Sequence, residues 1–404
     1  MRILTIGLGG AGCRIVDRLF VHDRKAPVHC VFGIAVDCDA DQLNSLLHVP
    51  PDQRLFFQPL DPSQPGDLVA HMPSEEVLSR LQSMDDGDID ALLVCAGLGG
   101  TMAGTAPELV SYLKKSIGEP IFGLCTLPCR EEGDDRASIA ADQLDSLLGV
   151  MDGMILFDNE SWKERASSMP GDESPMRPGD LANLILQRPG TSPPVSGRAR
   201  FFAGMNNLIS RRITLLLRAG EYSDREPADL PQVVLDAGEI LNTIQGMGFI
   251  TIGYARDEVE GERALNLLSR IHPGIPQVQD QHLKASRVVD LTKKSISDEI
   301  STPTELEKAK KALILIAGPS HEMSMKGFMT VRRWVDRTIG GLELRSGDYP
   351  VSGSHFLGIF VILAGMDTLP RVEELRQIRE RVRGGSGSRK TDPGIDPAET
   401  TTLF

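Results

Sequence analysis

The sequence predicts an α/β fold in which helices cover both faces of a parallel sheet. Five short apolar runs have the length of buried strands: 3–6, 31–36, 91–95, 120–124 and 153–157. Three amphipathic stretches lie between them and have helical periodicity: 13–20, 107–116 and 137–149. Strands that alternate with helices in this way pair in parallel, with crossover helices on both faces. This alternation ends near residue 200, which predicts a second, smaller α+β domain.

The composition limits the class of protein. The chain has 404 residues, and roughly 150 residues per domain predicts two to three domains. The net charge is −13 with no polybasic block, which argues against a nucleic-acid binder. No apolar run approaches the ~18 residues of a spanning helix, and we expect no signal peptide at Met1. The six cysteines follow no zinc spacing, so we expect reduced thiols in the cytoplasm.

A break and two helices follow the predicted parallel strands. Residues 163–200 are rich in proline, serine and glycine and predict a loop insertion, with one helical piece near 181–186. A long amphipathic helix is expected at about 202–218, and a second helix at about 231–246.

The remaining residues predict the α+β part and a tail. Four apolar runs predict strands: 250–254, 312–317, 342–345 and 356–363. A helix is expected at 322–338, whereas 257–299 mixes helical charge patterns with short apolar runs. From residue 383 onward, the Gly, Ser, Pro, Asp and Thr composition predicts a disordered tail.

Two glycine-rich loops carry the strongest functional signal. Gly7–Gly12 (GLGGAG) fits G-x-G-x-x-G, follows a predicted strand and opens a predicted helix. Ala96–Pro107 (AGLGGTMAGTAP) has the same position after the 91–95 strand. Glycine lets the backbone approach phosphate oxygens, and a helix N-terminus supplies N–H groups. The two loops therefore indicate one polyphosphate held from two sides, with no P-loop lysine, so that backbone dipoles and a metal ion would balance its charge.

A dinucleotide site is the alternative that the first loop leaves open. A Rossmann dehydrogenase has the same glycines and an acid after the second strand, where Asp37 stands here. Such an enzyme does not need the second loop, and the C-terminal half contains no convincing catalytic His or Lys constellation. An NAD-dependent oxidoreductase stays as an alternative interpretation.

Two polar segments extend the predicted site. Asp158-Asn159-Glu160 follows the fifth predicted strand, and α/β folds place ligands at the carboxyl ends of parallel strands. Asn206-Asn207 opens the long helix, and an Asn side chain offers the acceptor and donor that suit the edge of a purine. Each segment alone is more typical of a turn or a helix cap. Together with the two glycine loops, however, the four segments follow one another along the chain in the order of contacts to phosphate, phosphate, sugar and base.

In this order the motifs resemble the tubulin/FtsZ superfamily, and most closely its archaeal CetZ-type members. Three segments are similar to the family's phosphate-side loops: GLGGAG, AVDCDADQL and AGLGGTMAGTAP. Three others resemble its ribose segment, sugar loop and base-contacting helix start: TLPCREEGDDR, FDNESW and GMNNLI. The C-terminal half agrees in VVLDAGEILNTIQGMGFITIGYA and LELRSGDYPVSGSHFLGIFVIL. The resemblance covers about residues 1–365 apart from 163–200.

The resemblance implies a site for GTP or GDP with Mg²⁺, built without a dedicated protein metal cluster. Glu132 stands where the family has an acid for the ribose, Arg136 follows it, and Asn206 has the base-contacting position. The residues expected to contact the nucleotide are Gly9, Gly10, Ala11, Gly12, Cys13, Arg14, Asp37, Asp39, Gly97, Leu98, Gly99, Gly100, Thr101, Met102, Ala103, Gly104, Glu132, Arg136, Asp158, Asn159 and Asn206.

The resemblance also implies a GTPase whose active site is shared between two subunits of a filament. The family's acidic loop, N-x-D-x-x-D/E, maps onto Val234–Glu239, so Asp236 and Glu239 would orient the attacking water at the neighbouring subunit's nucleotide. Their spacing places both carboxylates on one face of a helical turn.

The implied biology is head-to-tail self-association into cytoplasmic filaments with a role in cell shape, and no binding of nucleic acid. The C-terminal tail is a candidate attachment point for a membrane or for division and shape factors.

Departures from the family pattern define a further alternative. The second glycine loop is one residue short, Met102 and Ala103 replace a Gly and a hydroxyl residue, and Val234 replaces the Asn of the acidic loop. These changes favour slow turnover, or a structural protein that binds nucleotide without hydrolysing it.

The predicted organisation has four parts. A nucleotide-binding domain covers 1–201, including the 163–200 insertion, and a connecting helix covers 202–220. A C-terminal activation domain covers 221–367, and 368–404 holds a helix remnant and the disordered tail.

Overall fold

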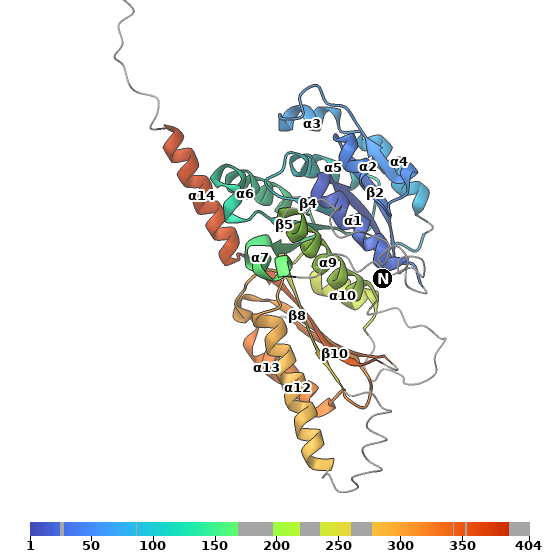
Figure 1. The fold of residues 1–404 in the computed structure, drawn as a ribbon, viewed down its shortest axis with the longest axis vertical. Coiled ribbons are helices and arrows are strands. Elements are labelled where there is room, and N and C mark those ends of the chain that lie inside the picture. The colour runs from blue at the N-terminus through green and yellow to red at the C-terminus, as the bar shows by residue number, and fades with distance from the viewer. Residues whose placement is uncertain are drawn as a thin grey trace, which may run out of the picture.

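One mixed sheet of ten strands organises the molecule (Figure 1), in the order β3-β2-β1-β4-β5-β6-β7-β10-β8-β9. The computed structural model describes residues 1–24, 28–85, 87–168, 197–218, 235–259, 277–341, 343–351 and 354–387. Among these residues, no helix has the length and apolar character needed to cross a membrane.

The first six strands are parallel and confirm the predicted α/β half. They are β1 (Ile3–Leu8), β2 (Val31–Asp37), β3 (Arg54–Phe56), β4 (Ala91–Gly97), β5 (Ile121–Leu127) and β6 (Gly153–Asp158). The helices that connect them are α1 (Gly9–Asp23), α2 (Ala40–Asn44), α3 (Pro65–His71), α4 (Ser74–Met84), α5 (Ala106–Leu113) and α6 (Asp134–Leu148). The sequence did not predict β3, α2, α3 or α4, because these elements are short or bury few side chains.

The second half continues the same sheet with antiparallel pairs. β10 (Phe356–Met366) lies between β7 (Phe249–Glu258) and β8 (Lys311–Gly318), antiparallel to both, and the edge strand β9 (Glu343–Pro350) is parallel to β8. Its helices are α10 (Ala237–Ile244), α12 (Gln277–Ser297) and α13 (Met325–Thr338). Only two residue pairs join β6 to β7 across the middle of the sheet, Met154 with Phe249 and Ile155 with Ile250.

Several helices differ from their predicted ranges. α7 (Asn159–Ser168) and α9 (Gly197–Arg218) enter the predicted 163–200 insertion from its two ends, and the expected piece at 181–186 lies outside the described residues. α12 is a single helix where a mixture was expected. α14 (Pro370–Gly387) is an 18-residue helix, so the expectation that disorder starts at residue 383 was wrong. The 345–350 segment belongs to strand β9, although its Ser, Gly, Asp and Pro residues are typical of a turn.

The core lies on both faces of the sheet. Along β1, Leu4, Ile6 and Leu8 belong to one apolar cluster with the buried residues of α4, α5, α6 and α14. Ile3 belongs to the other cluster, with the buried residues of α1 and α9. Alternate side chains of a strand point to opposite faces, so a strand that is buried on both is apolar throughout. This explains why the parallel strands were visible in the sequence as continuous apolar runs.

Candidate functional site

A cleft of about 850 Å³ opens at the carboxyl ends of β1, β2 and β4. Sixteen of the residues predicted to contact a nucleotide line it: Gly9, Gly10, Ala11, Arg14, Asp37, Asp39, Gly97, Leu98, Gly100, Thr101, Met102, Ala103, Glu132, Arg136, Asn159 and Asn206. Parallel strands have their carboxyl ends at one edge of the sheet, so loops far apart in the sequence meet there. The cleft is large enough for a nucleotide-sized ligand.

The first glycine loop forms the tight entry into α1. Gly9 has a φ of +68°, a conformation that residues with side chains rarely adopt. A Cβ on Gly12 would lie 2.0 Å from the carbonyl oxygen of Cys95 in β4, so only glycine lets the helix approach the sheet this closely. No side chain caps the N-terminus of α1, and its first turn contains no acid. The first-turn N–H groups are therefore suited to bind an anion.

The second glycine loop packs directly against the first. A Cβ on Gly97 would lie 2.8 Å from the Cβ of Ala11, and a Cβ on Gly9 would lie 2.8 Å from the Cβ of Met102. Gln143 of α6 fixes the loop from behind: its Oε1 accepts from Gly99 N–H (2.8 Å) and its Nε2 donates to the Gly100 carbonyl (2.7 Å). The two loops thus form one wall, with the buried Met102 side chain at their junction.

Two aspartates stand beside the loops at the end of β2. Asp39 caps α2, and its Oδ1 accepts from Asp41 N–H and Gln42 N–H. Asp37 is 3% exposed, and burial raises the pKa of its carboxyl above the ordinary value. Its Oδ1 accepts from Asp39 N–H, whereas its Oδ2 has no hydrogen-bond partner within the described residues. A buried, unpaired carboxylate oxygen is costly, so this atom marks a place for a cation or a donor.

No group of three or more His, Cys, Asp or Glu side chains that could hold a metal exists among the described residues. A magnesium ion therefore has no protein cage here. Asp37 Oδ2 fits such an ion only where phosphate oxygens and water supply most of the ligands, as is usual for Mg²⁺.

The opposite end of the cleft combines charged, aromatic and amide side chains. Glu132 Oε1 accepts from Cys129 N–H (3.0 Å), and its Oε2 is 2.6 Å from Arg136 Nη1 and 3.7 Å from Arg198. The Arg198 guanidinium lies over the Phe202 ring, 5.6 Å from its centroid. Asn206, one turn further along α9, is 9% exposed and also lines the cleft. An acid, an aromatic ring and an amide suit a sugar and a base.

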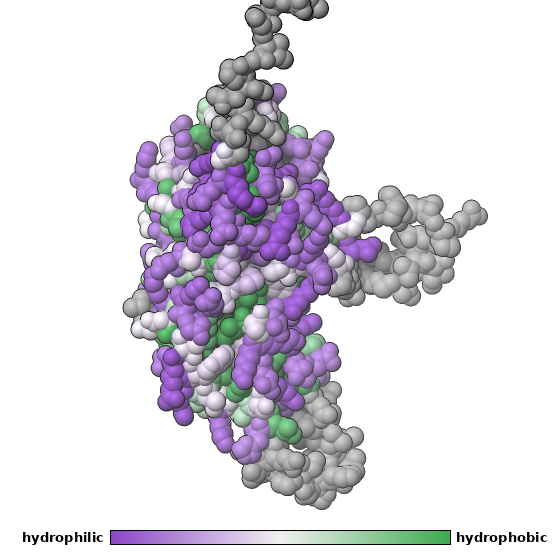
Figure 2. All heavy atoms as spheres, turned by 90° about the vertical axis from the view of Figure 1, so that its left-hand side faces the viewer, coloured by the Kyte–Doolittle hydropathy of each residue, from purple (hydrophilic) through white to green (hydrophobic). Residues whose placement is uncertain are grey.

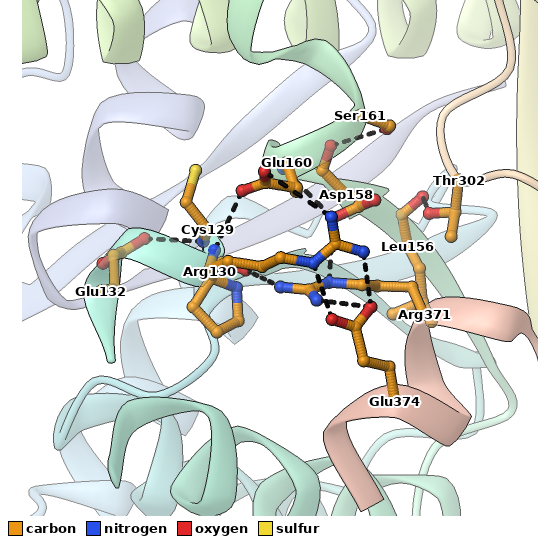
Figure 3. A network of polar contacts seen from close by, with 11 residues as sticks. Cys129, Arg130, Glu132, Leu156, Asp158, Glu160, Ser161, Thr302, Arg371 and Glu374 are labelled. Atoms are coloured by element: carbon orange, nitrogen blue, oxygen red, sulfur yellow. Dashed lines mark hydrogen bonds and ion pairs between the residues drawn. The ribbon is translucent and has the colours of Figure 1, made fainter. Parts of the chain in front are cut away.

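Asp158 and Asn159 are neighbours at the end of β6, but their side chains point in different directions. Asn159 lines the cleft, and its buried Oδ1 has no hydrogen-bond partner within the described residues. Asp158 is absent from the lining, and its Oδ1 is 3.4 Å from Arg371 Nε of α14 (Figure 3). Burial raises the pKa of Asp158, while Arg371 opposes this rise. Of the two, Asn159 is therefore the side chain available to a ligand.

Four other predicted contact residues are also absent from the lining: Gly12, Cys13, Gly99 and Gly104. They support the loops from behind. Cys13 is fully buried and its thiol donates to the Gly7 carbonyl (3.3 Å), and Gly99 is held by Gln143. None of the six cysteines, all of which lie within the described residues, forms a disulfide.

Sequence reasoning missed thirteen residues of the lining, among them Gln42, Arg198 and Phe202. Gln42 accepts a hydrogen bond from Arg14 across the first loop, and Arg198 and Phe202 line the far end from α9. Arg198 belongs to the predicted insertion, and neither it nor Gln42 lies in a glycine motif or at a strand end. An aromatic ring beside the Asn206-Asn207 pair was the available signal for Phe202.

The two predicted catalytic acids are absent from the cleft lining. α10, which carries them, ends at Ile244 beside Met1 and Ile3, at the amino end of β1. Asp236 is exposed and caps α10, and its Oδ1 accepts from Glu239 N–H (2.7 Å). Glu239 Oε1 accepts from Arg345 Nη1 of β9 (2.8 Å). Val234, which precedes this turn, lies outside the described residues.

Comparisons with known proteins identify the family of the chain. The family model "Tubulin/FtsZ family, GTPase domain" matches residues 2–167, and "Tubulin-like CetZ, C-terminal domain" matches 199–380. The chain is 31% identical over 388 residues to the tubulin-like protein CetZ3 of Haloferax volcanii, covering 94% of this chain and 91% of that protein. It is 29% identical to CetZ1 of the same organism over 394 residues, covering 94% of this chain and 91% of CetZ1.

Solved structures show the same likeness. A GDP-bound monomer of CetZ1 from Haloferax volcanii matches with a TM-score of 0.72 and 27% identity, covering 95% of this chain and 100% of that chain. A GTPγS-bound protofilament of CetZ2 from Haloferax volcanii matches with a TM-score of 0.72 and 25% identity, covering 97% and 100%.

Proposed function

The chain belongs to the tubulin/FtsZ superfamily, among its CetZ-type proteins, and we propose that it is a GTPase that assembles head to tail into filaments. The observation that carries the proposal is the separation of two sets of residues. The glycine loops form a cleft at the carboxyl ends of the parallel strands, whereas Asp236 and Glu239 are absent from its lining and belong to the first turn of α10, whose last residue Ile244 lies beside Met1 and Ile3. One subunit therefore binds the nucleotide, and a second supplies the acids.

In this proposal the cleft binds a guanine nucleotide along its length. The N–H groups of α1 and of the 97–104 loop hold the phosphates, because both loops allow close backbone approach. Glu132 and Asn159 bind the ribose, and Asn206 binds the base beside Phe202. The unpaired Asn159 Oδ1 gains a donor when the ligand is present.

Catalysis then requires a heterologous contact between two copies. Such a contact joins different faces of identical subunits and builds open filaments. It brings Asp236 and Glu239 of one subunit to the γ-phosphate in the next, where a carboxylate orients the attacking water and accepts its proton. The backbone N–H groups of the loops stabilise the charge that develops on the phosphate.

Asp37 is the residue that would hold a magnesium ion, through its unpaired Oδ2. When bound, Mg²⁺ supplies charge neutralisation on the β- and γ-phosphates. The raised pKa of Asp37 in the free chain follows from its burial, and a neighbouring cation would restore the ionised form.

Two solved relatives support this assignment. CetZ1 of Haloferax volcanii is a GDP-bound monomer and CetZ2 of the same organism a GTPγS-bound protofilament. We extend both properties to this chain, together with a role in cell shape in the cytoplasm. The oxidoreductase alternative loses its basis, because the family accounts for the glycine loop and Asp37.

The experiment is phosphate release from GTP with Mg²⁺ across a range of protein concentrations. We expect specific activity to rise with concentration. The double variant Asp236→Ala/Glu239→Ala is expected to lose this activity while its Kd for GDP stays that of the wild type. Glu75→Gln, an exposed acid on α4, is the matched control and keeps both properties.

Two results would contradict the proposal. Tight GDP binding with negligible phosphate release at every concentration would make the protein a nucleotide-binding structural protein, the alternative that Met102 and the shortened loop favour. Binding of NAD in place of guanine nucleotides would instead return the dinucleotide alternative.

A further inference from the structure

We propose that Arg371, at the start of α14, is a positioning residue for the ribose side of the cleft, and that docking of this helix is thereby coupled to nucleotide binding. The inference rests on the proposed function, because it names a regulatory contact of the same site. α14 lies along α6 at the edge of the molecule (Figure 1), more than 200 residues from the loops it touches.

The Arg371 guanidinium reaches two loops at once. Its side chain is 4% exposed, and Nη2 donates to the carbonyl oxygen of Pro128 (2.7 Å), directly after β5. Nε lies 3.4 Å from Asp158 Oδ1, at the end of β6. Nη1 lies 2.8 Å from Glu374 one turn further along α14. A buried guanidinium with three fixed neighbours transmits a shift of the helix to both strand ends.

Glu374 extends the contact to a third point. Its carboxylate pairs with Arg130, at 2.7 Å from Nε and 3.0 Å from Nη2 (Figure 3). The hydrogen bond from Arg130 lowers the pKa of Glu374 to about 2. The backbone N–H of Arg130 in turn donates to Glu160 Oε2 (2.9 Å). These contacts tie the β5 loop, the first turn of α7 and α14 into one network.

The same two loops contribute the lining residues next to this network. Pro128 itself lines the cleft, and Glu132 follows it by one short turn. Asn159, with its unpaired Oδ1, is the neighbour of Asp158. A ligand that orders Glu132 and Asn159 must therefore also order the atoms that Arg371 holds. Any such coupling is reciprocal: nucleotide stabilises the docked helix as much as the docked helix stabilises bound nucleotide.

A second set of ion pairs docks α14 without touching the cleft. Arg379 pairs with Asp142 and Asp145 of α6, at 3.1 and 2.6 Å, and Arg383 pairs with Asp142. Seen from the α14 side, the upper part of this face is mostly hydrophilic (Figure 2). Substituting Arg379 or Arg383 loosens α14 but leaves the contacts of Arg371 with Pro128 and Asp158 in place. Such a variant therefore serves as a control for Arg371.

The test compares Arg371→Gln with Arg379→Gln in the full chain. We measure the Kd for GDP and the amide hydrogen exchange of residues 370–384 with and without GDP. We expect Arg371→Gln to raise the Kd about tenfold, within the usual range of coupling between sites, and to abolish the slowing of exchange that GDP causes in the wild type. Arg379→Gln is expected to speed exchange in α14 while its Kd stays within twofold.

Glu374→Gln is the second variant, because its half-buried side chain can be changed without emptying the core. It keeps Arg371 with its contacts to Pro128 and Asp158 but loses the ion pairs of Glu374 with Arg130 and Arg371, so we expect a Kd between those of the wild type and Arg371→Gln. Equal GDP affinity in all variants, or α14 exchange that ignores GDP in the wild type, would overturn the inference alone. A wild-type chain that binds no GDP would overturn the proposed function and this inference together.

Discussion

The cleft and the α10 turn differ in whether the side-chain oxygens assigned to function already have partners. Within the described residues, Asp37 Oδ2 and Asn159 Oδ1 in the cleft are buried and have no hydrogen-bond partner. On α10, Asp236 already caps the helix and Glu239 already pairs with Arg345, although Arg345 Nε is itself buried without a hydrogen-bond partner there. The oxygens in the cleft thus lack partners that a ligand would supply, whereas the carboxylates of the α10 turn have protein partners.

Under the proposed function, this difference explains how a single subunit binds a nucleotide without hydrolysing it. Buried groups that lack partners carry a cost that a ligand relieves, so the cleft is built for binding within one subunit. The acids of the α10 turn have structural partners in the free chain, and in the proposed filament they meet the cleft of another copy. Hydrolysis would thereby depend on assembly.

The largest effect is expected from a substitution that disrupts the cleft and leaves α10 unchanged. In Gly12→Ala, the new Cβ would lie 2.0 Å from the Cys95 carbonyl oxygen, which belongs to the backbone and cannot move aside. We expect a loss of about 3 kcal/mol in the free energy of unfolding and no measurable GDP binding. Gly66→Ala is the control, because nothing lies within 4 Å of its Cβ. Denaturant unfolding and GDP titration check both; normal GDP affinity in Gly12→Ala would contradict this view of the loop.

The second effect separates the two roles of Asp236. Asn caps a helix about as well as Asp, whereas Ala costs about 1 kcal/mol of stability. We therefore expect Asp236→Asn to keep the unfolding midpoint and Asp236→Ala to lower it. Both are expected to reduce phosphate release by about 100-fold, since neither retains the carboxylate that orients the water. Full turnover in Asp236→Asn would show that the residue is only a cap.

A third change concerns the unpaired acid of the cleft. Because burial raises the pKa of Asp37, its ionised form destabilises the free chain at neutral pH. Asp37→Asn should therefore add about 1 kcal/mol to the free energy of unfolding at pH 7, and weaken Mg²⁺-dependent nucleotide binding. The gain shrinks as the pH falls through the raised folded pKa and vanishes well below 3.8, where the wild-type carboxyl is protonated in both states. Unfolding curves of the wild type and Asp37→Asn at several pH values measure this gain. A gain that grows as the pH falls would contradict the prediction.

The smallest effect is expected at the ion pair between Arg345 and Glu239. Arg345→Gln removes the ion pair with Glu239, whose side chains are 24% and 34% exposed. Water screens such a pair, so we expect a loss below about 1 kcal/mol and an unchanged Kd for GDP. Thermal unfolding of the free subunit measures it. A loss of GDP binding in this variant would show that the cleft and the α10 turn are not independent.

The local features of the protein were determined by its sequence. The five long parallel strands are continuous apolar runs because both faces of the sheet are covered. Gly9 and Gly12 were identified by the G-x-G-x-x-G motif between a predicted strand and helix, and the structure gives the reason: a left-handed φ at Gly9 and the close approach of Gly12 to Cys95. Such features depend on neighbouring residues in the chain and on the periodicity of apolar residues, so a single sequence predicts them.

Only the tertiary structure decided which distant residues share a site. Arg198 and Phe202 line the cleft from a part of α9 without a recognisable motif, and Asp158, which its motif placed with the ligand, faces Arg371. The continuous sheet depends on two residue pairs at the β6–β7 seam, and α14 docks through ion pairs between residues about 240 positions apart. These contacts follow from how packed elements meet in space, and that geometry has no signature in the local order of residues.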